Sequence, residues 1–93
     1  MTKSELVDRI VAANGILTRK ESELVVNIVF DSMSEALKNG EKVEIRGFGS
    51  FTVRERGARE ARNPKSGEIV NIQAKKAPFF KTGKELRERV DTL

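Results

Sequence analysis

Hydrophobic positions repeat at helical spacing along the first forty residues. In residues 3–14 and again in residues 19–39, apolar side chains recur every three to four positions, which predicts two amphipathic helices. Gly15 and Gly40 follow these stretches, where glycine commonly ends a helix in a left-handed conformation. Residues 1–40 are therefore expected to form a helical hairpin.

The period then changes to that of β-strands. Val43 and Ile45 alternate with charged residues, which predicts a first strand. Residues 46–49, with two glycines, indicate a tight turn, and the alternation resumes at Phe51 and Val53. This pattern predicts two antiparallel strands directly after the helical hairpin.

A hairpin with little to bury follows. Residues 54–62 hold no large apolar side chain, and residues 63–67, Asn-Pro-Lys-Ser-Gly, are dense in turn formers. We expect residues 41–81 to form a small antiparallel sheet, from which residues 54–74 extend as a β-ribbon arm. Residues 82–93 are expected to form a C-terminal helix, so the chain is predicted to be one α+β domain over residues 1–93.

Three segments begin with the capping-box pattern Ser/Thr-x-x-Glu. In this motif the hydroxyl accepts a hydrogen bond from a backbone N–H, and the Glu side chain reaches back to the N–H of the cap residue. The three matches lie ahead of the two helices of the hairpin and of a short helix predicted over residues 83–90, and they begin at Thr2, Thr18 and Thr82. Leu86 and Val90 would form the apolar side of that last helix.

The predicted core is small for an independent domain. Without the arm, only about 70 residues remain, a size at which a single core is marginal. Four phenylalanines also crowd the small sheet, namely Phe48, Phe51, Phe79 and Phe80. We expect a second chain to complete these faces in an obligate dimer.

Charge is distributed unevenly along the chain. The net charge is +4, but residues 1–45 carry six basic and eight acidic side chains, whereas residues 46–84 carry ten basic and three acidic ones. Such asymmetry suggests that the second part faces a polyanion. A solvated surface whose charges serve only solubility is the alternative at this point.

The residue types that are absent narrow the chemistry. The chain has no His, Cys, Tyr or Trp. His usually performs general acid–base catalysis, and most zinc sites need His or Cys. A carboxylate- or lysine-based enzyme is the alternative on these grounds, but no paired constellation supports one, so we expect no enzyme activity, metal or other cofactor. The N-terminus is too polar for a secretory signal and no apolar run reaches membrane-span length, so we expect a cytoplasmic protein with no membrane partner.

Cations recur at short intervals along the predicted arm, at Arg54, Arg56, Arg59, Arg62 and Lys65. DNA presents negative charge along its whole length, so cations spaced along a strand suit phosphate binding. The alternative is an edge strand that charge protects from aggregation.

Pro64 lies at the predicted tip of the arm. Proline can act as an apolar wedge that enters between base steps from the minor groove, but it is also a common turn residue. Glu44 and Arg46 lie on one strand face, where they could form a plain surface ion pair or an Arg aimed at a minor groove. Lys84, at a predicted helix start, could hold a phosphate.

Several motifs together resemble the bacterial HU and integration host factor family. These are Arg46-Gly47-Phe48-Gly49-Ser50-Phe51, Arg62-Asn63-Pro64, Lys65-Ser66-Gly67-Glu68 and Pro78-Phe79-Phe80-Lys81-Thr82-Gly83-Lys84. The resemblance covers essentially the whole chain, and residues 1–6 and 44–49 look most like the β subunits of integration host factor. One departure lies at Glu60-Ala61, where the family commonly has Thr-Gly.

This resemblance implies an intertwined homodimer or heterodimer of the bacterial nucleoid, with a helical base and two β-arms, that binds and bends double-stranded DNA. It implies roles in DNA condensation, recombination and transcription regulation, and no small-molecule substrate. Arg62, Asn63 and Pro64 would enter the minor groove with Pro64 intercalating, and Glu44 and Arg46 would set sequence preference. The full expected DNA-binding set is Lys3, Glu44, Arg46, Arg54, Arg56, Arg59, Arg62, Asn63, Pro64, Lys65, Lys75, Lys76, Lys81 and Lys84. A protein-interaction module that uses the helical hairpin without binding DNA is the alternative.

Overall fold

A computed structural model describes residues 1–92, which form three α-helices and five β-strands. The α+β class predicted from the sequence is confirmed. The chain divides into two compact units, a helical unit of residues 1–36 and a sheet unit that begins at Leu37. Leu93, the last residue of the predicted C-terminal segment, lies outside the described residues.

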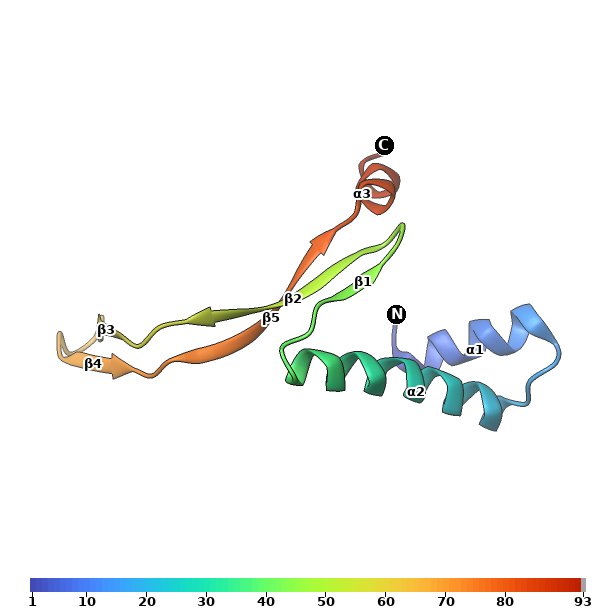
Figure 1. Cartoon of the computed structure of the whole chain (residues 1–93), viewed down its shortest axis with the longest axis horizontal. Coiled ribbons are helices and arrows are strands. Elements are labelled where there is room, and N and C mark those ends of the chain that lie inside the picture. Colours follow the sequence, from blue (N-terminus) through green and yellow to red (C-terminus); the bar gives the residue numbers. More distant parts are fainter. Residues whose placement is uncertain (93) are drawn as a thin grey trace. The chain divides into compact units, whose positions relative to one another are not determined.

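The helical unit contains α1 (Lys3–Asn14) and all but the last two residues of α2 (Arg19–Lys38), and a short loop joins the two helices into a hairpin (Figure 1). The predicted bounds hold for α1, and α2 ends one residue before the predicted Asn39. Gly15 ends α1 with a φ of 63°, the left-handed conformation expected there.

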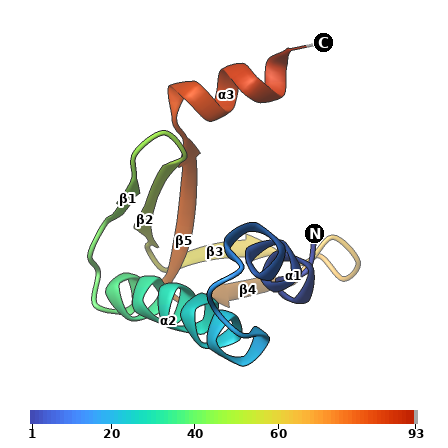
Figure 2. The same ribbon diagram turned by 90° about the vertical axis from the view of Figure 1, so that its right-hand side faces the viewer.

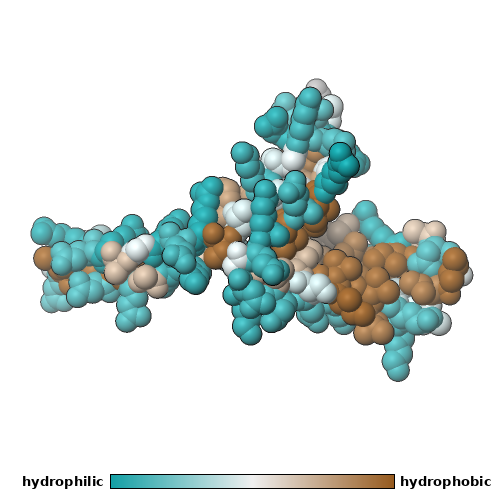
Figure 3. Space-filling model, viewed as in Figure 1, coloured by the Kyte–Doolittle hydropathy of each residue, from teal (hydrophilic) through white to brown (hydrophobic). Residues whose placement is uncertain are grey.

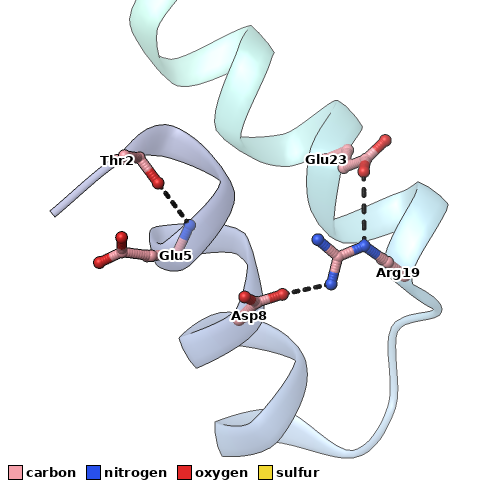
Figure 4. Close-up of polar contacts among 5 residues, drawn as sticks. All are labelled: Thr2, Glu5, Asp8, Arg19 and Glu23. Atoms are coloured by element: carbon pink, nitrogen blue, oxygen red, sulfur yellow. Dashed lines mark hydrogen bonds and ion pairs between the residues drawn. The ribbon is translucent and has the colours of Figure 1, made fainter.

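Of the two predicted capping boxes of the hairpin, the one at α2 is complete and the one at α1 forms only its Thr hydrogen bond. At α1 the Thr2 hydroxyl accepts a hydrogen bond from the backbone N–H of Glu5 at 3.1 Å (Figure 4). At α2 the box is reciprocal, because Thr18 accepts from the Glu21 N–H at 3.1 Å and donates its own N–H to the Glu21 carboxylate at 2.9 Å. This backbone hydrogen bond lowers the pKa of Glu21.

An arginine joins the two helices. The Arg19 guanidinium donates through Nη1 to the Asp8 carboxylate of α1, and its Nε lies 3.6 Å from Glu23 Oε1 on α2 (Figure 4). The hydrogen bond with Asp8 and the charges of Asp8 and Glu23 raise the pKa of Arg19. Because these groups are exposed, they orient the helices more than they stabilise them.

Few side chains of the helical unit are buried. Val7 and Val26 are the buried hydrophobic residues of the part of the chain that the structure describes, and Ser22 between the helices is fully buried. An apolar stripe of α2 faces solvent instead, with Leu24 59% and Ile28 55% exposed. Figure 3 shows hydrophobic residues gathered on the visible surface of the helices. A large part of the apolar face of α2 is therefore uncovered in a single chain.

The sheet unit is built on three antiparallel strands in the order β1-β2-β5 (Figure 2). These strands are β1 (Val43–Ile45), β2 (Gly49–Arg56) and β5 (Lys75–Thr82). The predicted turn joins β1 to β2, with the Phe48 N–H donating to the Ile45 carbonyl at 3.0 Å. Gly47 is the third residue of this turn, and its φ of 84° is the positive value that a type II turn requires at that position.

Aromatic rings pack on one face of this sheet. The Phe80 ring lies 4.7 Å from that of Phe51 and 5.4 Å from that of Phe48, measured between centroids. Phe51 and Phe80 are direct cross-strand partners in β2 and β5. Phe48 and Phe80 nevertheless remain 44% and 37% exposed, so this cluster is also incompletely covered.

The third predicted capping box is wrong. Helix α3 (Lys84–Asp91) has Gly83 as its N-cap, with no side-chain capping bond. Thr82 is still part of β5, where it pairs with Gly49, and its hydroxyl donates to the Gly83 carbonyl at 3.2 Å. The Gly83 N–H donates to the Phe48 carbonyl at 2.9 Å, so backbone contact with the β1–β2 turn fixes the start of α3.

Candidate nucleic-acid interface

The predicted arm is a long antiparallel ribbon. Strands β2 and β5 pair as far as Arg56 and Lys75, and the ribbon resumes in the two-stranded sheet of β3 (Arg59–Arg62) and β4 (Ile69–Ile72) (Figure 1). Two residues on each strand separate the ladders, so the register is preserved across the break. A pocket at this junction is lined by Glu55, Arg56, Gly57, Ala74, Lys75 and Lys76.

The tip of the arm is a turn with defined hydrogen bonds. The Asn63 N–H donates to the Glu68 carbonyl and the Gly67 N–H donates to the Asn63 carbonyl, both at 2.8 Å. The Asn63 side chain accepts from the Lys65 N–H at 2.9 Å, and Gly67 has a φ of 73°. Pro64, which has no N–H to satisfy, occupies the exposed position directly after Asn63.

Cations concentrate on one face of the β2–β5 ladder. Side chains alternate between the two faces of a strand, so the pairing places Arg54 and Arg56 of β2 on the same face as Lys75 and Lys81 of β5. Within β2 and β5 that face carries no carboxylate, and Glu44 of β1, which pairs with Ser50, lies on it at the end away from the arm. The one acidic residue of the ladder, Glu55, lies on the opposite face, 3.4 Å from the Lys76 ammonium.

Arg59 and Arg62 lie on opposite faces of the outer sheet, because three positions separate them. Ala61 departs from the family pattern but pairs regularly with Val70. No residue other than glycine has a positive φ within residues 1–92, so alanine is accommodated here in ordinary extended backbone. Glu60 is exposed beside Ala61.

The remaining predicted residues belong to other elements than the arm. Lys3, in the helical unit, donates to the Asn27 side chain at 2.9 Å. Arg46 occupies the β1–β2 turn, but Glu44 pairs with Lys42 at 3.7 Å rather than with Arg46. Lys84 begins α3 and lies 4.0 Å from Glu88.

All fourteen predicted residues are exposed, and most of them belong to the arm and its base. Two side chains that support them were not predicted. Asn27 contacts Lys3, and the Phe79 ring lies under the guanidinium of Arg54. The contact between Arg54 and Phe79 could be predicted only from the strand register, which the hydrophobic pattern does not define.

Neither a membrane span nor a metal site is present in the part of the chain that the structure describes. No helix there is long and apolar enough to cross a membrane. No group of three or more His, Cys, Asp or Glu side chains among residues 1–92 could hold a metal ion.

Comparisons with known proteins agree over nearly the whole chain. The sequence pattern of the family described as bacterial DNA-binding protein matches residues 1–91. The integration host factor subunit beta proteins of Pseudomonas entomophila and Stutzerimonas stutzeri are each 50% identical to this chain over 91 residues. The matches cover 98% of this chain and 93% and 98% of those proteins.

Solved structures are similar as well. The HU of an Anabaena HU–DNA cocrystal superposes with a TM-score of 0.86 at 43% identity, covering 98% of both chains. HU from Thermotoga maritima gives a TM-score of 0.67 at 33% identity, covering 98% of this chain and all of that one.

The fold and the matched residues define a bacterial architectural DNA-binding protein rather than an enzyme. The chain belongs to the bacterial DNA-binding protein family, which includes HU and integration host factor. Membership confirms the resemblance inferred from the sequence motifs, and the alternative of an interaction module without DNA binding is set aside.

Proposed function

We propose that this chain, as a dimer, binds double-stranded DNA through its arms in the minor groove and kinks the duplex by inserting Pro64 between base steps. The geometry of the tip carries the proposal. Pro64 is exposed at the end of the ribbon, and three hydrogen bonds of Asn63 hold the backbone beside it. An apolar wedge on an ordered turn can enter a base step without first losing much conformational freedom.

Wedge insertion from the minor groove is the known mode of HU and integration host factor, so the mechanism itself is not new. The sequence of this chain assigns each role in that mechanism to a particular residue. Arg62 and Asn63 flank Pro64 and would contact the minor groove beside the wedge. Arg46, exposed in the β1–β2 turn, would contribute sequence preference together with Glu44.

Phosphate contacts would offset the cost of unstacking the bases. The face of the β2–β5 ladder that carries four cations and no carboxylate is suited to the DNA backbone. The proposed phosphate-binding residues are Lys3, Arg54, Arg56, Arg59, Lys65, Lys75, Lys76, Lys81 and Lys84. Because phosphate contacts carry little sequence information, these residues would set affinity rather than specificity.

We further propose that two chains intertwine, so that residues 1–93 act as one domain completed by a partner. The uncovered apolar stripe of α2 and the half-exposed aromatic cluster are where a second chain would gain most by burial. The partner is a second copy or a related subunit, and the complex would reside in the bacterial nucleoid.

Fluorescence energy transfer across a short end-labelled duplex tests the wedge. Pro64→Ala removes the apolar wedge but leaves the cations in place, so the variant should bind linear duplex nearly as tightly and bend it less. The chain offers a matched control in its only other proline, Pro78, which pairs with Val53 in the sheet. Pro78→Ala should bend DNA as the wild type does. Equal energy transfer in the Pro64→Ala and wild-type complexes would contradict the proposed role of Pro64.

A further inference from the structure

We propose that Phe79 is a positioning residue for DNA binding: its ring holds the guanidinium of Arg54 on the cationic face of the arm base, with the donor edges of that group free for a phosphate. This inference rests on the proposed function, because it concerns the same DNA-binding surface. It assigns a task to an aromatic side chain that makes no contact with DNA in the proposal above.

The contact between the two side chains is close and follows from the strand register. The Arg54 Cζ atom lies 3.4 Å from the centroid of the Phe79 ring. Thr52 pairs with Phe79 and Arg54 with Ala77, so the two residues are diagonal neighbours on one face of the ladder. Long and aromatic side chains reach each other at this spacing.

Stacking uses one face of the guanidinium and leaves its edges available. The five N–H donors of arginine lie in the plane of the group, so a ring below that plane does not compete for them. Arg54 takes part in none of the ion pairs formed within residues 1–92. Its neighbour Glu55 lies on the opposite face, because side chains alternate along the strand, and is paired there with Lys76. A phosphate approaching Arg54 would therefore meet free donors.

Arg19 shows the contrasting arrangement. Two of its nitrogens face carboxylates, those of Asp8 and Glu23, so its donor edges are engaged within the protein. Arg19 serves the helical unit, whereas Arg54 is held by a group that accepts no hydrogen bond in the guanidinium plane. Arg19 is thus bound to carboxylates of the protein, whereas Arg54 keeps its donors available for an external anion.

Phe79 is not needed for the aromatic cluster of the sheet. Phe80 makes the ring contacts with Phe48 and Phe51 on the other face, and Phe79 forms no ring pair within residues 1–92. Phe79 is 38% exposed. Phe79 contacts the Arg54 guanidinium instead. An arginine that is already restrained in this way loses less side-chain freedom when a phosphate binds.

A double-mutant cycle on DNA affinity tests the inference. The proteins are the wild type, Phe79→Leu, Arg54→Ala and the double variant, titrated against a short fluorescent duplex at fixed salt. We expect Phe79→Leu to weaken binding by about two- to fivefold, the range of an exposed cation–π contact. In the Arg54→Ala background the same change should have no further effect. Phe79→Trp, which keeps an aromatic face, should retain the wild-type affinity.

Arg56 supplies the matched control. It lies on the same face as Arg54, two positions along β2, but not over the ring. Phe79→Leu should therefore weaken binding equally in the wild-type and Arg56→Ala backgrounds. In the NMR spectrum, the ring-current shift of the Arg54 side-chain protons should disappear in Phe79→Leu while the amide spectrum of α1 is unchanged.

Two results would overturn the role of Phe79. One is a Phe79→Leu effect of the same size with and without Arg54, which would indicate a general structural role, including a contact with the second chain. The other is unchanged affinity in Phe79→Leu. Failure of the proposed function is distinguishable from both, since the wild-type protein itself would then either not bind the duplex or bind it without bending it in the energy-transfer assay.

Discussion

Gly49 occupies a position in β2 that leaves no room for a side chain. A Cβ atom built there would lie 2.5 Å from the Phe80 ring and 2.6 Å from the Lys81 carbonyl oxygen. The φ of Gly49 is not positive, so the constraint is the space beside β5 rather than backbone conformation. The close approach lets the first pair of the ladder, Gly49 with Thr82, form beneath the aromatic cluster.

Gly49→Ala should destabilise the fold by about 1–3 kcal/mol, the usual cost of overpacking a filled site. Gly57 gives the matched control, because nothing lies within 4 Å of a Cβ built there and its φ is not positive. Gly57→Ala should leave stability nearly unchanged. Urea denaturation of the two variants and the wild type measures the difference, and equal midpoints for the two variants would contradict the steric account.

Single residues were the hardest feature to predict from the sequence. The fourteen proposed DNA-binding residues are exposed, as their charge or turn position led us to expect. The protein side chains that they contact could not be predicted. Glu44 and Arg46 share a strand face in the sequence pattern, yet Glu44 pairs with Lys42 because Arg46 has already entered the turn. The contact of Arg54 with Phe79 depends on a diagonal relation that only the register defines.

Elements were predicted well where local interactions determine them. Helices α1 and α2 begin at Lys3 and Arg19 as expected, because the capping hydrogen bonds of Thr2 and Thr18 are local in sequence. At α3 the capping pattern was misleading. There the long-range bond from Gly83 to Phe48, and the pairing of Thr82 in β5, determine where the helix begins.

The arm could be predicted because its composition is unusual, but its internal break could not. Residues 54–62 lack large apolar side chains, which indicated a ribbon without a core. The two residues on each strand between the ladders, Gly57 and Ala58 on one side and Gln73 and Ala74 on the other, do not form regular pairs. The register continues because both strands lose the same number of pairs.

At the scale of the whole molecule, the prominent feature is apolar surface without a cover. Val7 and Val26 are the buried hydrophobic residues among residues 1–92, while Leu24 and Ile28 in the apolar stripe of α2 are each more than half exposed. The sequence predicted this shortage from chain length and from the crowding of phenylalanines. It could not specify whether the partner is identical or related, because self-association and pairing with a homologue bury the same face.

We predict that the protein sediments as a dimer at micromolar concentration. Ile28→Asp places a charge in the uncovered stripe, so the variant should dissociate and lose helical structure, because an unpaired buried charge is unfavourable. Arg9→Gln, an exposed change on α1 outside this stripe, should leave the dimer intact. A folded, monodisperse monomer of the wild type would contradict the proposed assembly.

Binding to a short duplex, linear or nicked at its centre, across a salt series tests the central claim of DNA bending most directly. If six phosphates are contacted, affinity should fall roughly a thousandfold between 50 and 200 mM salt. The nicked duplex should bind more tightly than the linear one at every salt concentration, because less energy is needed to bend it. Binding that is insensitive to salt, or that does not distinguish the nicked from the linear duplex, would contradict the account.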